Sequence, residues 1–138
     1  MTEARRSLGA AGEQQAARWY EAHGYRVLDR NWRCREGELD LVVARRRLLV
    51  FVEVKTRRTD RFGTPAEAVT PAKQRRLRVL ASRYLAITGA RPAALRFDVV
   101  SILADRLEVI EAAFLPGSGA AGAAAGAVGP AAVVPVAA

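Results

Sequence analysis

The chain has 138 residues, which is enough for one domain with a single hydrophobic core. Cys34 and His23 are its only cysteine and histidine. This excludes an intramolecular disulfide, a thiolate metal cluster, a multi-histidine metal site and a Ser-His-Asp triad away from His23. The formal net charge of +8 favours a polyanionic partner, nucleic acid before a membrane surface. Arginine and alanine are so abundant that a coding bias is the alternative explanation of this charge.

The sequence divides into a charged part, residues 1–115, and an uncharged tail, residues 116–138. Alanine, glycine, proline and valine make up the whole tail except Ser118. Such a tail cannot bury enough large apolar surface to offset its ordering entropy, so we expect it to be disordered. A membrane anchor is the alternative, but the tail lacks leucine, isoleucine and phenylalanine, and Pro130 and Pro135 interrupt it. Because the N-terminus lacks an apolar signal-peptide core, we expect a cytoplasmic protein without a membrane partner.

The helical spacing of apolar residues predicts a first helix over residues 7–23. Gly24 then provides a stop, because glycine takes the left-handed conformation without steric strain. Gly9 and Gly12 each weaken a helix by ~1 kcal/mol relative to alanine. We therefore expect this face of the helix to lie close to another backbone.

Three short β-like runs follow, and the second and third are separated by the arginines at 45–47, which predict a hairpin turn. The third run is apolar on both faces, which is typical of a central strand. The predicted strands cover residues 25–33, 39–44 and 48–55.

Residues 56–68 are polar and predict a mobile loop. Thr70 followed by Pro71 is a favourable helix start, and the helical spacing continues to Gly89. Two final strands are predicted over residues 95–103 and 106–114. The order helix, three strands, helix, two strands predicts an α/β sandwich, with a mixed central sheet of about five strands flanked by two helices.

The residues that indicate chemistry are Asp40, Glu53 and Lys55. Glu53 and Lys55 alternate onto the same face of one strand. An antiparallel turn would bring Asp40, at the start of the preceding strand, beside Glu53. Two adjacent carboxylates repel each other unless a proton or a cation relieves the repulsion. A divalent metal held by few carboxylates, together with a lysine ammonium, is what phosphodiester hydrolysis requires.

The identity of Lys55 supports a chemical role for this position. The chain has 20 arginines and only 2 lysines, so arginine would be the usual cation here if the two were equivalent. An ammonium can shift its pKa and act at close quarters, whereas a guanidinium stays protonated.

Asp40 followed by Glu53-Val54-Lys55 resembles the signature of the restriction-endonuclease-like (PD-D/E-x-K) nuclease superfamily. More closely, the span from Gly9 to about Ile110 is similar to the YraN-like family of uncharacterised bacterial proteins, whose fold resembles that of archaeal Holliday-junction resolvases. Four motifs carry this resemblance: Gly9 to Glu13, Gly37 to Leu41, Val50 to Arg57, and Arg96 to Val100.

The resemblance implies a restriction-endonuclease-like fold and a role for each matching residue. Asp40 and Glu53 would hold Mg²⁺ or Mn²⁺, Lys55 would serve the attacking water, and Glu13 would add a helix-borne acid. The implied substrate is nucleic acid, DNA before RNA, and the resolvase likeness points to branched junctions. Symmetric cleavage of a junction would need a homodimer. Leu39 stands where the wider superfamily often has proline before its first acid.

Other charged residues have less specific interpretations. Arg57, Arg58, Lys73 and Arg76 are the candidate phosphate contacts, because they follow the acidic motif or begin the second helix. We expect Arg96 and Asp98 to pair with each other, since they share a strand face. The alternative to a nuclease is a nucleic-acid-binding module of the same fold without productive cleavage.

Overall fold

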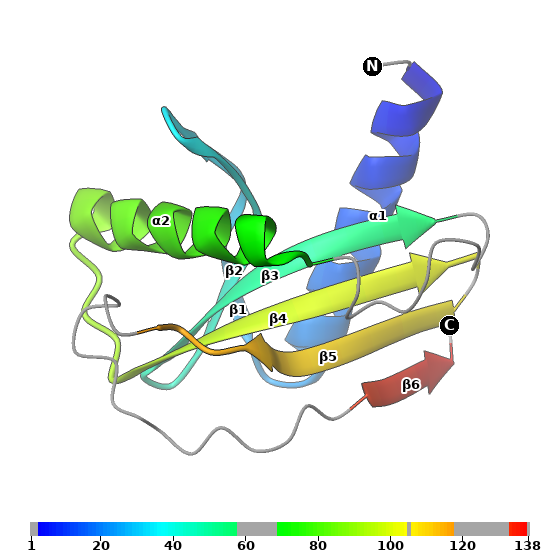
Figure 1. Ribbon diagram of the computed structural model, residues 1–138. Coiled ribbons are helices and arrows are strands. Elements are labelled where there is room, and N and C mark those ends of the chain that lie inside the picture. The colour runs from blue at the N-terminus through cyan, green and yellow to red at the C-terminus, as the bar shows by residue number, and fades with distance from the viewer. Residues whose placement is uncertain (1–2, 58–68, 105, 118–132, 138) are drawn as a thin grey trace.

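The strands form one mixed sheet whose neighbours follow chain order, from β1 to β6, with two helices packed on it (Figure 1). This computed structural model describes residues 3–57, 69–104, 106–117 and 133–137. The elements are α1 (Glu3–Ala22), β1 (Arg26–Cys34), β2 (Gly37–Arg45), β3 (Leu48–Arg57), α2 (Pro71–Thr88), β4 (Ala94–Leu103), β5 (Arg106–Phe114) and β6 (Val133–Ala137).

The sheet is antiparallel except at its centre, where β3 and β4 run parallel. Two parallel neighbours need a crossover, and α2 supplies it by returning along the sheet from the end of β3 to the start of β4. The expected fold class is therefore confirmed, including the hairpin between β2 and β3. The helix and strand bounds differ from the predicted ones by at most four residues, and those of β5 match at both ends.

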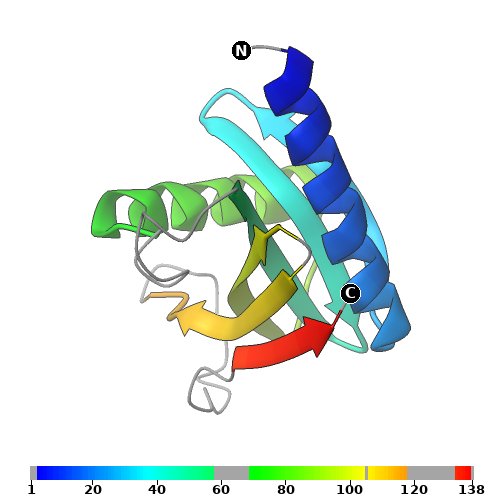
Figure 2. The same ribbon diagram turned by 90° about the vertical axis from the view of Figure 1, so that its right-hand side faces the viewer.

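The two faces of the sheet bury separate apolar clusters, so the molecule is a three-layer sandwich (Figure 2). Helix α2 covers one face, where Leu77, Leu80 and Tyr84 pack on Phe51 and Phe97. Helix α1 covers the other face, where its buried residues pack on β2, β3, β4 and β5; they include Ala16, Ala17, Trp19 and Tyr20. Alternation along the strands produces both clusters, because successive side chains point to opposite faces.

The two glycines of α1 differ in their surroundings. A Cβ on Gly12 would overlap Thr56 Oγ1 and lie 3.3 Å from Ile102 Cδ1, so Gly12 permits a close approach of α1 to the sheet. A Cβ on Gly9 would meet nothing within 4 Å. Close packing is thus confirmed at Gly12, although against side-chain atoms of the sheet rather than a backbone, and the expectation is wrong at Gly9.

Both ends of α2 are capped as the sequence predicts. The Thr70 side chain accepts a hydrogen bond from the Lys73 backbone N–H at 3.2 Å, and Pro71 opens the helix. Gly89 ends it in the left-handed conformation with φ of 72°, donating its N–H to the Leu85 carbonyl. These caps fix where α2 begins, close to the end of β3.

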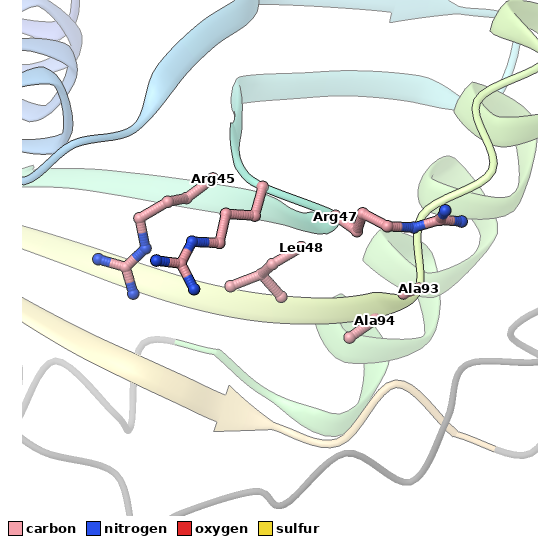
Figure 3. Close-up of a pocket in the computed structure, with 6 residues that line it drawn as sticks. Arg45, Arg47, Leu48, Ala93 and Ala94 are labelled. Carbon is pink, nitrogen blue, oxygen red and sulfur yellow. The ribbon is translucent and has the colours of Figure 1, made fainter.

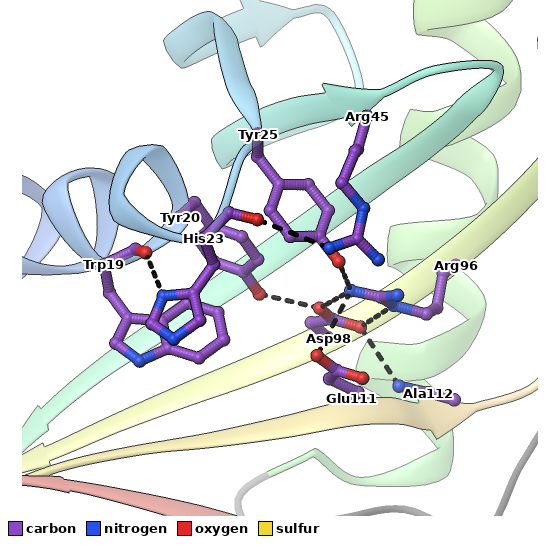
Figure 4. Close-up of polar contacts among 9 residues, drawn as sticks. All are labelled: Trp19, Tyr20, His23, Tyr25, Arg45, Arg96, Asp98, Glu111 and Ala112. Carbon is purple, nitrogen blue, oxygen red and sulfur yellow. Dashed lines mark hydrogen bonds and ion pairs between the residues drawn. The ribbon is translucent and has the colours of Figure 1, made fainter.

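A buried polar network ties α1 to the sheet (Figure 4). Asp98 is 1% exposed and accepts hydrogen bonds from the Tyr20 hydroxyl at 2.7 Å and from the Ala112 N–H at 3.0 Å. The Arg96 guanidinium binds the same carboxylate through two N–H groups at 2.8 Å and donates to the Tyr25 hydroxyl. The expected pairing of Arg96 with Asp98 is confirmed, and its partners satisfy a charge that would otherwise be costly to bury.

The tail departs from the expectation of disorder in one segment. Residues 133–137 form β6, which pairs antiparallel with β5 and makes the sheet six-stranded rather than five-stranded. Its sequence, Val-Val-Pro-Val-Ala, is mostly β-branched, and an edge strand tolerates a proline. The free edge of β5 offers main-chain hydrogen bonds, which composition alone does not reveal. The sequence predicts a loop over residues 56–68, but residues 56 and 57 belong to β3. Residues 58–68 and 118–132 lie outside the described residues.

Within the described chain, no helix combines the length and the apolar character needed to cross a membrane.

Candidate functional site

Asp40 and Glu53 meet where β2 and β3 diverge. The paired register of these strands runs from Arg45 with Leu48 to Leu41 with Val52 and stops one residue before Asp40. There the Asp40 side chain replaces the main chain as acceptor, taking the Val54 N–H on Oδ2 at 2.9 Å. This hydrogen bond fixes the carboxylate beside β3. The structure thus brings together the two acids that the sequence singled out.

The two carboxyls share a proton in the metal-free protein. Burial, followed by the neighbouring charge of Asp40, raises the pKa of Glu53 to about 8. Burial also raises the pKa of Asp40, although its hydrogen bonds from Val54 and with Glu53 oppose that shift. Close like charges cannot both ionise easily, so one proton stays on the pair near neutral pH. A cation would take the place of that proton.

Both lysines of the chain lie at this acid pair. Lys55 Nζ is 3.9 Å from Glu53 Oε1, and its side chain is about one-third exposed. Lys73, in the first turn of α2, lies close to Lys55, and this proximity, together with burial, lowers the pKa of Lys73. The Glu53 carboxylate opposes that lowering, so it too is close to Lys73.

The sequence predicts Lys73 only as a phosphate contact, and the structure gives it a closer position in the site. The sequence contains one signal for this, namely that Lys73 is the other lysine in an arginine-rich chain. The crossover that places the start of α2 beside the end of β3 supplies the rest.

Glu13, on α1, lies near enough to Asp40 to be affected by its charge. Burial raises its pKa first, and the charge of Asp40 raises it further. The side chain of Asn31 donates a hydrogen bond to the Glu13 carboxylate and opposes the shift. Asn31 itself has φ of 51°, a left-handed conformation that asparagine tolerates better than most residues. Sequence reasoning missed Asn31, because its contact with α1 is made only in the folded chain.

The remaining candidates lie at different distances from the acid pair. Glu38 forms an exposed ion pair with Arg33 at 3.4 Å and acts on Glu13 only through its charge. Arg57 donates to Ser101 Oγ at 3.5 Å and is half-buried on β3. Arg76 is exposed on α2, with its side chain against Gly37. Arg58 lies outside the described residues.

The arrangement suits a cation that retains several waters. In the described part of the chain, no group of three or more Asp, Glu, His or Cys side chains is close enough to hold a metal by itself. Two carboxylates sharing a proton, with Glu13 nearby, match the preference of Mg²⁺ for few protein ligands completed by water and phosphate oxygens. The residues present therefore fit such an ion.

Comparison with known proteins identifies relatives of this chain. A family model described as "Uncharacterised protein family UPF0102" matches residues 12–102. These residues contain Glu13, Asp40, Glu53, Lys55 and Lys73.

Individual relatives are similar over most of their own length. A UPF0102 protein of Mycolicibacterium vanbaalenii is 53% identical over 116 residues, which is 84% of this chain and 96% of the relative. One from Symbiobacterium thermophilum is 59% identical over 97 residues, 70% of this chain and 82% of the relative. A third, from Beutenbergia cavernae, is 50% identical over 116 residues, 84% of this chain and 98% of the relative. Their names state no activity.

Proposed function

The chain belongs to the uncharacterised protein family UPF0102, and we propose that it is a metal-dependent endonuclease that hydrolyses phosphodiester bonds of DNA. The observation that carries this proposal is the proton-sharing pair of Asp40 and Glu53 with Lys55 and Lys73 against it. Burying two acids in one place for stability alone is unfavourable. A divalent cation bound by the two acids and an anionic substrate bound by the two lysines would relieve the repulsion within each pair.

Each side chain then has a distinct task. Asp40 and Glu53 would hold Mg²⁺ or Mn²⁺, which supplies an acidified water and polarises a phosphoryl oxygen. The Val54 N–H holds the Asp40 carboxylate in place, so the ligand is oriented before the metal arrives. Glu13, oriented by Asn31, would accept hydrogen bonds from water at the same site.

The two ammonium groups would act on the phosphate. Lys55, 3.9 Å from Glu53, would orient the attacking water and offset charge on the phosphoryl oxygens. Lys73 adds a second positive charge, and its proximity to Lys55 lowers the pKa of Lys73. An anionic phosphate between them would relieve their mutual repulsion.

The test uses purified full-length protein with labelled four-way, forked and linear DNA, with and without Mn²⁺ or Mg²⁺. We expect cleavage that requires the metal and is lost in Asp40→Asn and Glu53→Gln. Glu38→Gln is the matched control, because it removes a nearby acid that pairs with Arg33 instead. Lys55→Arg and Lys73→Arg keep the charge, so loss of activity in either variant shows a requirement for an ammonium.

Binding without cleavage would favour the second candidate, a nucleic-acid-binding module, which the net charge of +8 supports. Unchanged cleavage by Asp40→Asn would reject the proposed site, because cleavage would then come from elsewhere or from a contaminant. Comparison of junction, fork and duplex rates would identify the preferred DNA.

A further inference from the structure

A second cationic feature lies at the opposite end of the β2–β3 pair from the acids. Three consecutive arginines stand here: Arg45 ends β2, and Arg46 and Arg47 form the turn into β3. Together with Leu48, Ala93 and Ala94 they line a hollow of about 540 Å³, which we call the arginine hollow (Figure 3). Because α2 returns along the sheet, the segment between α2 and β4 lies at this same end of the molecule.

Two of the three guanidinium groups are held in place by the fold. The Arg45 guanidinium lies over the Tyr25 ring, 4.4 Å from its centroid, and donates to the His23 carbonyl at 3.3 Å (Figure 4). Arg47 Nη2 donates to the Arg91 carbonyl at 3.3 Å. Neutral partners of this kind orient a guanidinium without neutralising it. Ordering before binding reduces the entropy that a ligand contact must offset.

The charge of the arginine hollow is not balanced locally. All three arginines are exposed, and within the described residues none forms an ion pair with a carboxylate. Arg46 also adopts φ of 57°, a left-handed conformation in which glycine or asparagine would be less strained. Three adjacent like charges on a turn that favours other residues are unfavourable for the isolated fold. An anionic ligand would relieve that repulsion.

We propose that the arginine hollow binds backbone phosphates of the same DNA that the acid pair cleaves, as a second contact remote from the scissile bond. This inference rests on the proposed function for its choice of ligand. The cations of the hollow are all arginines, whose guanidinium groups bind phosphate through paired N–H groups. Both lysines, in contrast, lie at the acid pair. The arginine hollow at one end of the β2–β3 pair thus binds the DNA, and the acid pair at the other end cleaves it.

The spacing predicts how much DNA reaches both places. Asp40 and Arg45 are five residues apart on β2, or about 17 Å at ~3.3 Å per residue. A duplex advances about 3.4 Å per base pair, so roughly five base pairs separate the two contacts. Short duplexes therefore reach one contact at a time, and longer ones reach both.

The test measures affinity of the full chain for duplexes of about 5 to about 20 base pairs, without metal, at several salt concentrations. Arg46→Gln/Arg47→Gln removes two of the three charges and leaves Arg45 in its place on Tyr25. We expect affinity to fall by about 10-fold or more on long duplexes and by less than about 2-fold on the shortest. The log–log salt slope on long duplexes should become shallower by about 0.9 for each phosphate that the variant no longer neutralises.

Arg18→Gln/Arg35→Gln is the matched control, because it removes the same charge from two exposed positions outside the hollow. Its effect should not depend on duplex length. Three results would each overturn the inference. The hollow variant could bind long duplexes as tightly as the wild type, the control could show the same length-dependent loss, or the wild type could fail to bind DNA. Cleavage is measured separately with Mn²⁺. Absence of cleavage would reject the proposed nuclease activity. The length dependence of DNA binding would still decide whether the arginine hollow binds phosphates.

Discussion

Because the pKa of Glu53 is raised, the acid pair makes the unfolding free energy of the metal-free protein depend on pH. The unfolded chain ionises this group near its ordinary pKa of 4.5, but the folded protein holds the proton until about pH 8. The folded state therefore binds more protons between these values, and the unfolding free energy falls as pH rises through this window. The fall would amount to at most about 5 kcal/mol, at about 1.4 kcal/mol per pKa unit.

Glu53→Gln should remove that fall, because the amide is neutral at every pH in the window. The variant should be more stable than the wild type at pH 8 and nearly equal to it at pH 4.5, in the presence of EDTA. Urea unfolding at several pH values measures both quantities. A wild-type and a variant curve that stay parallel from pH 4.5 to pH 8 would show that the proton is not shared as described.

Asp40 carries the prediction of metal binding. Asp40→Ala removes one of two carboxylates that would hold the ion, and leaves the Val54 N–H without its acceptor. Calorimetry should show Mn²⁺ binding to the wild type and an affinity at least about 10-fold weaker in the variant. Glu36→Ala is the control, since Glu36 is exposed and pairs with Arg83. Equal Mn²⁺ affinity of wild type and Asp40→Ala would exclude the metal site.

At the residue scale, strand alternation and the hairpin were enough to place Asp40, Glu53 and Lys55 together. Those contacts depend on local spacing and on one short turn. Asn31 and the close approach of Lys73 could not be predicted in the same way. They depend on how α1 and α2 cross the sheet, which the packing of whole helices decides.

At the scale of elements, the glycines of α1 control how closely this helix approaches β3. Gly12→Ala should lower stability by about 1–3 kcal/mol, because its Cβ would overlap Thr56 Oγ1. Gly9→Ala is the matched control and should raise stability by about 1 kcal/mol, because its Cβ meets open space. Thermal unfolding distinguishes the two.

Removing the obstructing hydroxyl should reverse the effect of Gly12→Ala. Thr56 Oγ1 is buried without a hydrogen-bond partner among the described residues, so Thr56→Ala breaks no hydrogen bond there. Gly12→Ala/Thr56→Ala should recover much of the missing stability. Because Glu13 follows Gly12, Mn²⁺ affinity should fall and recover in parallel. A decrease in stability without any change in Mn²⁺ affinity would show that Glu13 does not contribute to the site.

The elements with strong local signals were predicted well, and those that depend on a partner strand were not. Helix α2 has its N-cap at Thr70, proline in its first turn and glycine at its end, so its bounds follow from local chemistry. β6 has no such signal, because alanine, glycine and proline surround its valines. It forms against the free edge of β5, a partner that local sequence does not identify.

At the scale of the whole molecule, two groups of cations lie at opposite ends of the β2–β3 strand pair. The acid pair, with both lysines, lies at one end, and the arginine hollow lies at the other. A duplex along this axis would meet cations at both contacts, which favours steered association and strong salt dependence.

The tail contributes one described element to the molecule, the strand β6 at the edge of the sheet. Strand order separates β6 from β2 by three strands, so it lies on the far side of β5 from the acid pair. Truncation after Gly117 should lower the unfolding free energy by at most about 2 kcal/mol, because five paired residues are removed but their ordering entropy is recovered. Mn²⁺ and DNA affinity should stay the same within error, since the tail carries no charge. Loss of either binding on truncation, with the truncated protein still folded, would place part of the site in the tail and contradict its assignment to the sheet and the two helices.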